Sequence, residues 1–393
     1  MNKTADPLYY SQLECPVCKT INEFENIKAG SYTESGKDSD FRPTGRAWLN
    51  FEYNKYNPLL FFIATCKKCF YSREFNQDYK NWQKDASFKT YRLKIIQEAH
   101  LKDLSKSDGI VRLLGQHINQ GKHPFESAVI KFLLAIYDLK LQSRPPQLDI
   151  GRYFLRIGWL FREKNESGGT VVNKGSGLFI KLRAENNDTR LSLPKIEENM
   201  DGLKRMIEHD FPLMFGNVPD FEHYIQSLRQ AISEVSLSVN SLITADSKFL
   251  QVITDTEKAL TGAEPSSETA FFEFSSFAEF LKLIRELWDE VPLSEEEALL
   301  KAAQYYEKAY QGSGEISQGI QQVQAAYLIA ELSRRVNNNE NANQYFNQAI
   351  RLGREITMSK GLDKSTVSFT KKLLEMAMDQ ARLNKKESEG VAS

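Results

Sequence analysis

Cysteine is scarce in this 393-residue sequence, which contains only four. All four fall in two short pairs, so none is left over for the disulfide framework of a small secreted protein. The first ten residues lack an apolar segment behind their charge, and the apolar run at 59–65 is far too short to span a bilayer. We therefore expect a cytoplasmic protein that makes no membrane contact.

The sequence also has no excess of charge of either sign, because it contains 51 Lys and Arg residues and 52 Asp and Glu residues. A dedicated polyanion binder usually carries a basic excess. The sequence has no His-Glu-x-x-His, no Gly-x-Ser-x-Gly and no ordered phosphate-binding glycine loop. These absences predict a protein without catalytic activity. The histidines show no metal-ligand spacing, and we expect them to be surface or half-buried residues: His100, His117, His123, His209 and His223.

The residues that are present predict a mostly α fold. Aromatic and turn residues dominate 8–80, where we expect short strands, with 59–63 as the best single strand. Helical periodicity then runs to about residue 383. We predict a small β-rich zinc-ribbon-like N-terminal domain, followed by an α-helical, tetratricopeptide-like repeat domain with a long-helix insertion. The expected segments are 8–80 (zinc ribbon), 81–166 (first repeat part), 167–265 (insertion), 266–384 (second repeat part) and 385–393 (disordered tail).

The two cysteine pairs read Cys-Pro-Val-Cys and Cys-Lys-Lys-Cys. Each Cys-x-x-Cys turn brings two thiolates to one side, and two such turns complete a tetrahedral shell that leaves no position for water. Free thiols and a redox pair are the alternatives, but neither pair begins a helix in a strand–helix–strand unit. We predict one structural Zn²⁺ ion, and expect Cys66→Ser to unfold this domain while leaving the helices largely intact. The predicted ligands are Cys15, Cys18, Cys66 and Cys69.

Small and aromatic residues recur on the helices with the spacing of tetratricopeptide repeats. The second helix of such a repeat carries Ala-x3-aromatic-x2-Ala, and stacked pairs form a concave surface that binds proteins. After Phe161, which ends a first-helix pattern, no second helix follows on schedule. An ordinary helical domain without a groove is the alternative. The second-helix matches are Ala128, Phe132 and Ala135; Ala302, Tyr306 and Ala309; and Ala342, Phe346 and Ala349.

A long helix is predicted over 221–260, with apolar residues at alternating spacings of four and three. A stripe this narrow requires a partner helix. We expect an intrachain partner, either 197–209 or 277–288. The alternative is coiled-coil self-association, or docking onto a second protein, through 221–260.

Several of these elements together resemble a bacterial family, domain of unknown function 2225. They are the first Cys-Pro-x-Cys, the acidic turn at 38–43, the Asn57-Pro58 pair and the second Cys-x-x-Cys. The resemblance implies a zinc-ribbon-like head on a helical repeat body and supplies no activity. Two departures stand out: Phe70 occupies a position that is usually glycine, and 168–265 resembles an insertion.

Three functions compete at this point. The leading hypothesis is a scaffold or adaptor that binds another protein through a helical repeat surface. The second is a zinc-ribbon nucleic-acid binder that uses Trp48, Tyr53, Arg42 and Arg46, although 11 basic against 10 acidic residues in 1–80 weigh against it. The third is an enzyme with an unrecognised site. Asp38 and Asp40 fit an acid pair or a Mg²⁺ site, but more often such residues cap turns.

Overall fold

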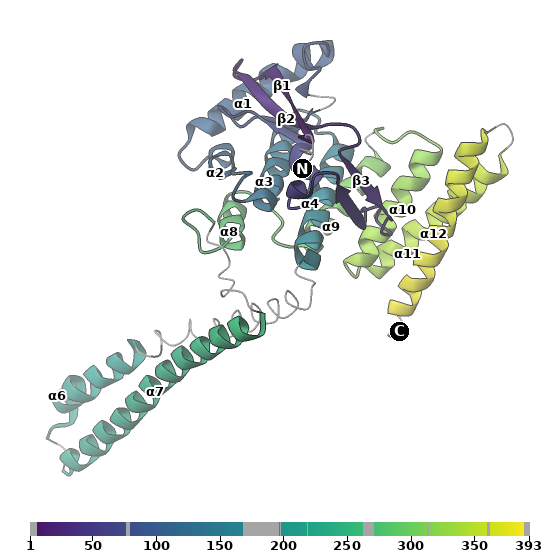
Figure 1. Cartoon of the computed structure of the whole chain (residues 1–393). Helices are drawn as coiled ribbons and strands as arrows, with labels where there is room; N and C mark the ends of the chain where they lie inside the picture. Colours follow the sequence, from purple (N-terminus) through teal and green to yellow (C-terminus); the bar gives the residue numbers. More distant parts are fainter. Residues whose placement is uncertain are drawn as a thin grey trace. The chain divides into compact units, whose positions relative to one another are not determined.

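A computed structural model describes residues 6–75, 79–167, 196, 198–217, 219–261, 271–312, 314–359 and 362–388. The chain divides into two compact units (Figure 1). The first unit contains Met1–Lys164 and Ala270–Ser393, and the second contains Asn165–Thr269. None of the helices within the described ranges is long and apolar enough to cross a membrane.

The N-terminal part is rich in strands, as the sequence predicts, and we call residues 6–75 the head. Three antiparallel hairpins form it, each a two-stranded sheet. Strand β1 (Leu8–Glu14) pairs with β2 (Ile21–Ile27), and β3 (Tyr32–Ser35) pairs with β4 (Gly45–Trp48). Strand β5 (Ile63–Thr65) pairs with β6 (Ser72–Glu74). The first and third hairpins each end in a cysteine pair.

The strand predicted over 59–63 is wrong for most of its length. Residues Pro58–Phe61 form the 3₁₀ turn η2, and β5 begins only at Ile63. The Asn57 side chain accepts a hydrogen bond from the Leu59 backbone N–H (2.9 Å), which caps the turn. Pro58 sits at its first position, where a missing N–H costs nothing. Local capping therefore decides the conformation, although the run is apolar enough for a buried strand.

Helices make up the rest of the first unit. They are α1 (Leu93–Ser105), α2 (Ile110–Gln116), α3 (Pro124–Lys140), α4 (Gln147–Ser167), α8 (Phe277–Leu287), α9 (Glu295–Gln311), α10 (Ile320–Arg335), α11 (Asn339–Met358) and α12 (Lys364–Ser388). Ser276, Ser294 and Asn338 begin three of them by accepting a hydrogen bond from the backbone three residues on. Helix α12 runs to Ser388, so the disordered tail predicted from 385 is wrong for 385–388, and 389–393 lie outside the described residues.

The head and the helices share one hydrophobic core. Trp48, Leu60 and Ile63 of the head are buried in the same cluster as α3, α4 and α9. Helix α3 also contacts η2, β5 and β6. A second cluster surrounds the cysteines and includes Trp82 and Ile96, which follow the head in the sequence. The head thus has a small core around the cysteines and also shares the larger core with the helices.

Helices α4 and α9 lie against each other in antiparallel orientation, although 128 positions separate the end of one from the start of the other. A Cβ atom added at Gly158 would come within 2.7 Å of the Leu299 side chain, which would have to shift to admit it. The rings of Phe154 and Tyr305 stack with centroids 5.6 Å apart. The helix that packs on α4 around Phe154 and Gly158 is therefore α9.

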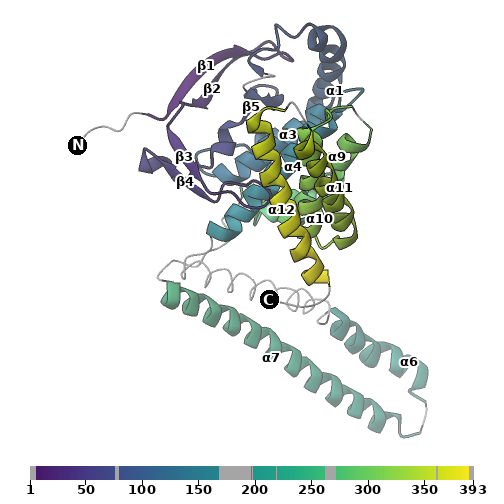
Figure 2. The same cartoon turned by 90° about the vertical axis from the view of Figure 1, so that its right-hand side faces the viewer.

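Helices α10, α11 and α12 continue beyond α9. Figure 2 shows the three helices grouped together with α12 in front, and α11 contacts both α10 and α12. Alanines at the contacts, such as Ala326, Ala330 and Ala342, are completely buried. Small side chains at these contacts permit α10, α11 and α12 to pack closely against one another.

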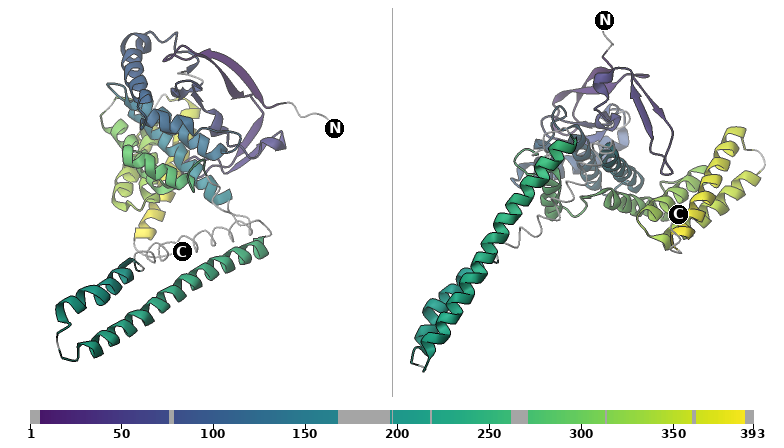
Figure 3. Two further views of the ribbon diagram at one scale, coloured as in Figure 1. Left: turned by 90° about the vertical axis from the view of Figure 1, so that its left-hand side faces the viewer. Right: turned by 60° about the horizontal axis from the view of Figure 1, so that its bottom comes forward.

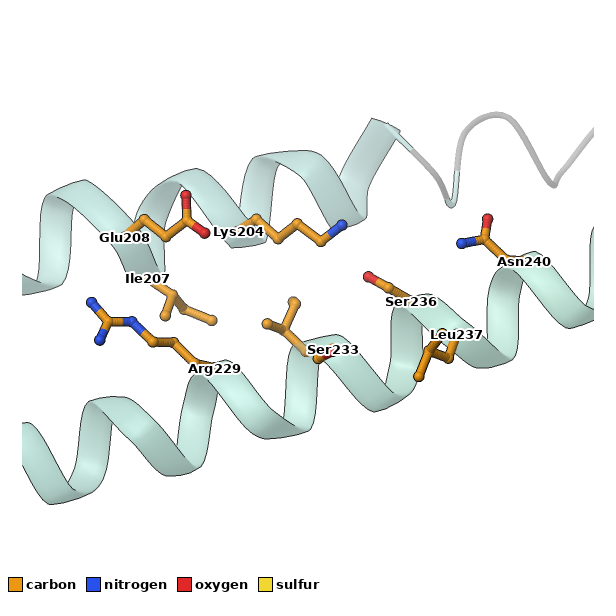
Figure 4. Close-up of a pocket in the computed structure, with 9 residues that line it drawn as sticks. Lys204, Ile207, Glu208, Arg229, Ser233, Ser236, Leu237 and Asn240 are labelled. Carbon is orange, nitrogen blue, oxygen red and sulfur yellow. The ribbon is translucent and has the colours of Figure 1, made fainter.

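The second unit, as far as it is described, contains two antiparallel helical segments (Figure 3). Residues 198–215 include η5 (Met206–Asp210) and α6 (Phe211–Phe215), and they run beside α7 (Phe221–Thr261). Figure 4 shows Ile207 pointing toward Arg229 and Ser233 of α7, beside a hollow of about 260 Å³.

Only one line of the apolar seam on α7 is covered. Ile225, Val239 and Ile253 are 1, 8 and 3% exposed. The alternate line is 40–59% exposed and comprises Leu228, Val235, Leu242 and Phe249. The seam that the sequence predicts therefore has a buried and an open row.

We expect a charged substitution to change the stability of this unit in the buried row of α7 and to leave it nearly unchanged in the open row. Ile225→Asp is expected to unfold this unit, because a buried carboxylate without a partner costs several kcal/mol. Val235→Asp is the matched control and should leave the melting temperature nearly unchanged, since its side chain already meets solvent. Circular dichroism melts and solution mass of both variants test this. Equal losses of stability would contradict it, and a fall in mass for Val235→Asp alone would reveal association through the open row.

Candidate metal centre

Each cysteine pair lies in the turn of a β-hairpin, and the two turns have the same backbone hydrogen bonds. Cys15 N–H donates to Thr20 O (2.9 Å) and Lys19 N–H donates to Cys15 O (3.0 Å). In the third hairpin, Cys66 N–H donates to Tyr71 O (3.0 Å) and Phe70 N–H donates to Cys66 O (2.9 Å). These bonds close each turn and direct both sulfurs of a pair to one side.

The residue after each pair has a left-handed backbone, with φ of 62° at Lys19 and 65° at Phe70. A side chain in this region costs roughly 1–2 kcal/mol relative to glycine. At Phe70 the ring packs directly on Gly115 of α2, where an added Cβ would come within 2.0 Å of it. The phenylalanine therefore gains a contact with the helices that glycine at this position would lack.

The four predicted ligand residues come together. One sulfur from each of Cys15, Cys18, Cys66 and Cys69 lies within 4.8 Å of every other. Across the pairs, the Sγ atoms of Cys15 and Cys69 are 3.6 Å apart, and those of Cys18 and Cys66 are 3.5 Å apart. Neighbouring sulfurs in a tetrahedral shell with metal–sulfur bonds of about 2.3 Å lie about 3.8 Å apart. The cluster can hold a metal ion.

The electrostatics of the cluster favour a cation. Cys15 and Cys66 are fully buried. Hydrogen bonding to Cys66, together with burial, raises the pKa of the Cys15 thiol to about 12. Hydrogen bonding to Cys15 and Cys66 raises the pKa of Cys69 as well, whereas hydrogen bonding from Cys15 and Cys69 lowers the pKa of Cys66, so the thiols do not ionise together. Four thiolates cannot coexist here at neutral pH unless a positive ion balances them.

The sequence did not predict a set of hydrogen bonds that surrounds the sulfurs. Asn22 Nδ2 donates to Cys66 Sγ (3.3 Å), and Asn22 Oδ1 accepts from the Lys67 backbone N–H (2.8 Å). His100 Nε2 donates to Cys69 O (2.7 Å), and His100 Nδ1 lies 2.6 Å from Asp138 Oδ1. Asp138 Oδ2 accepts from the Ser72 backbone N–H (2.8 Å). These residues tie the second cysteine turn to α1 and α3.

The position of His100 corrects a prediction. Its side chain is fully buried, as is that of Asp138, whereas the sequence suggested a surface or half-buried residue. Burial alone opposes a charge on the ring, but the Asp138 carboxylate outweighs it and raises the pKa of His100. An imidazolium here would add positive charge beside the thiolates. His117 is also buried, with 6% exposed.

Asp38 and Asp40 do not form a metal site. Arg162 donates to Asp38 Oδ2 and to Asp40 Oδ2, both at 2.8 Å, and Arg335 donates to Asp38 Oδ1 at 2.7 Å. The two carboxylates are therefore paired with guanidinium groups of α4 and α10. Among the described residues, the four cysteines are the one set of three or more potential ligands close enough to share an ion.

Comparison with known proteins identifies one family. A model described as "uncharacterized protein conserved in bacteria", domain of unknown function 2225, matches residues 8–205 and 283–383. No curated protein and no solved structure matches the chain. The unmatched stretch, 206–282, contains α7 and begins later than the insertion expected from 167. Because the match covers most of the chain, including all four cysteines, the protein belongs to this bacterial family.

Proposed function

We propose that the protein is a non-enzymatic, zinc-stabilised adaptor of the cytoplasm that binds an extended segment of another protein. One Zn²⁺ ion would be held by Cys15, Cys18, Cys66 and Cys69. Zinc suits four thiolates in a tetrahedral shell, and a shell closed by protein ligands serves structure rather than catalysis.

The helix pairing supports a repeat-type binding surface. Helices α2 and α3 contact each other, α4 packs on α9, and α10 packs on α11 with α12 beyond them. Their contact faces carry the small and aromatic residues that tetratricopeptide-like repeats use. Such arrays present an elongated surface to partner segments.

One hollow carries the proposal. It measures about 370 Å³ and lies between α9 and the turn that joins α10 to α11. Four side-chain amides line it, together with the 40% exposed Leu300: Gln304, Asn338, Asn341 and Gln344. An amide can both donate and accept, so it suits the alternating N–H and C=O groups of an extended peptide. Leu300 offers an apolar contact for one of its side chains.

The side chains that the nucleic-acid alternative needs are engaged elsewhere. Trp48 is 3% exposed, and its ring packs between Tyr32 and Tyr53. Arg46 donates twice to Glu163, at 2.9 and 3.2 Å. Bases stack on exposed aromatics, and phosphates require accessible cations. The protein-binding hypothesis is therefore the one we favour.

Affinity capture by the full zinc-loaded chain tests the proposal. The wild type should retain a specific protein partner after nuclease treatment. Gln304→Ala combined with Gln344→Ala should weaken retention by roughly tenfold or more, because each lost hydrogen bond is worth about 1 kcal/mol. Gln226→Ala with Gln230→Ala, on exposed positions of α7, is the matched control. Partner retention that is unchanged in the Gln304→Ala, Gln344→Ala variant would contradict the proposal. Recovery of nucleic acid with a steep salt dependence would also contradict it.

A further inference from the structure

A cavity of about 510 Å³ lies in the first unit, apart from the amide-lined hollow. Its walls come from β1, β2, η2, β5 and the second cysteine turn on one side, and from α2, α3 and the loop between them on the other. A volume of this size is typical of pockets for small molecules. Cys66 of the cysteine cluster also lines it, and it shares no residue with the amide-lined hollow.

Lys131 of α3 contributes a buried amine to this cavity. The residue is 7% exposed, and Nζ donates to Leu60 O (2.6 Å) and to Gln120 Oε1 (3.1 Å). Both acceptors are neutral, and no carboxylate of the described residues lies within ion-pair distance. A protonated amine has three N–H groups, so one remains for a further acceptor. Burial lowers the pKa of Lys131 to about 7, which reflects the missing counter-charge.

Negative charge lies close by, on β2. Gln120 Nε2 donates to Glu25 Oε2 (3.1 Å), so one amide group separates the Lys131 amine from the Glu25 carboxylate. Glu23 lines the same cavity. The charge of Glu25 also raises the pKa of Tyr10 on the neighbouring strand. Lys67, an exposed residue of the second cysteine turn, also lines the cavity, so the basic residues Lys131 and Lys67 share it with the acidic residues Glu23 and Glu25.

Apolar side chains line the remaining wall. Phe61 and Ile63 are buried residues of the head, and Phe70 and Ile118 pack from the cysteine turn and the end of α2. A ligand with an apolar group would bury it here, at about 25 cal/mol for each Å² removed from water.

We propose that this cavity binds a small apolar zwitterion, namely a free α-amino acid with an apolar side chain. The ligand carboxylate takes the third N–H of Lys131, its ammonium group meets Glu25, and its side chain lies against Phe61 and Phe70. The distance between the two charges of the ligand fits this arrangement. The ammonium and carboxylate groups of an α-amino acid are about as far apart as the nitrogen and oxygen of the Gln120 side-chain amide, which lies between Lys131 and Glu25. A simple anion would be repelled by Glu23 and Glu25, and a simple cation would leave Lys131 without a counter-charge.

Isothermal titration of the full zinc-loaded chain with L-leucine and L-phenylalanine tests the proposal. We expect saturable binding, with proton uptake at pH 8, since a carboxylate beside Lys131 favours its charged form. Leucinamide lacks the carboxylate and N-acetyl-leucine lacks the ammonium group. Each should bind at least tenfold more weakly than leucine.

Variants locate the site. Lys131→Met should abolish binding, and Glu25→Gln should weaken leucine at least tenfold while leaving N-acetyl-leucine unaffected. Lys122→Met, an exposed lysine outside the cavity, is the control. If Lys131→Met fails to fold, the partly exposed Glu25→Gln still decides the matter. Absence of binding by both amino acids at millimolar concentration, equal binding of leucinamide, or unchanged affinity in Glu25→Gln would overturn the proposal.

Discussion

Removal of the proposed Zn²⁺ ion is expected to unfold the head and to destabilise the helices of the first unit with it. Structural zinc sites bind their ion with about 10–16 kcal/mol, which is comparable to the about 5–15 kcal/mol that stabilises a whole domain. Trp48, Leu60 and Ile63 share a core with α3, α4 and α9, so the loss cannot stay within the head. His100 and Asp138 carry the effect directly to α1 and α3. Residues that pack as one unit unfold as one.

A chelator titration checks this result. Zinc release, followed by a metallochromic dye, should coincide with a fall in helical circular dichroism and in the melting temperature. Cys66→Ser should reproduce the change without chelator, whereas Ser105→Ala, at the exposed end of α1, should not. Unchanged helical signal after complete zinc release would show that the head unfolds alone, which is what the sequence by itself suggested.

Replacement of Arg162 by alanine is expected to cost about 3–5 kcal/mol of unfolding free energy. This guanidinium is 7% exposed and pairs with three carboxylates, those of Asp38, Asp40 and Glu295. Asp40 is fully buried and also accepts from Trp159 Nε1 (3.1 Å). Without the arginine, buried negative charges lose the partner that compensates for their desolvation.

Urea unfolding of Arg162→Ala and Arg382→Ala measures the difference. Arg382 also pairs with an aspartate, but both side chains are about 70% exposed, so its loss should cost less than about 0.5 kcal/mol. Comparable losses in the two variants would mean that the buried cluster contributes no more than a surface pair.

The same cluster should make the fold sensitive to acid. Burial opposes the charge of Asp38, but Arg335 and the other arginines outweigh it, and its pKa is lowered. A carboxyl whose folded pKa lies below its unfolded value adds stability above the unfolded pKa, near 3.9, and this is lost as the pH falls through the folded pKa. The wild type should therefore lose more stability below about pH 4 than Arg162→Ala, in which part of that stabilisation is already absent.

Features that depend on local spacing could be predicted from the sequence. Two Cys-x-x-Cys pairs permit few arrangements, so the cysteine cluster follows from the spacing alone. The strand-rich start follows from its aromatic and turn residues, and the helical remainder follows from hydrophobic periodicity. The backbone conformation of Phe70 could also be predicted, because a left-handed residue is typical of the position after a cysteine turn.

Features that depend on distant partners could not be predicted. Asp38 and Asp40 accept local backbone hydrogen bonds, as expected for residues that cap turns, but their pairing with Arg162 and Arg335, more than 100 positions away, could not be predicted. Lys131 lies in an apolar run of α3, but the sequence does not show which groups accept hydrogen bonds from its buried amine, namely Leu60 O and Gln120 Oε1. The pairing of α4 with α9 was hidden by the length of chain between them, although both helices carried recognisable patterns.

That pairing has a consequence for synthesis. At about 5–20 residues per second, a ribosome needs roughly 6–26 s to extend the chain from the end of α4 to the start of α9. During that interval the ribosome has made the apolar face of α4 around Phe154 and Gly158 but not α9, the helix that covers this face in the folded protein. Contacts this distant in sequence also form slowly once the chain is complete. The nascent protein therefore passes through a stage in which it is a natural client for chaperones that shield hydrophobic segments at the ribosome.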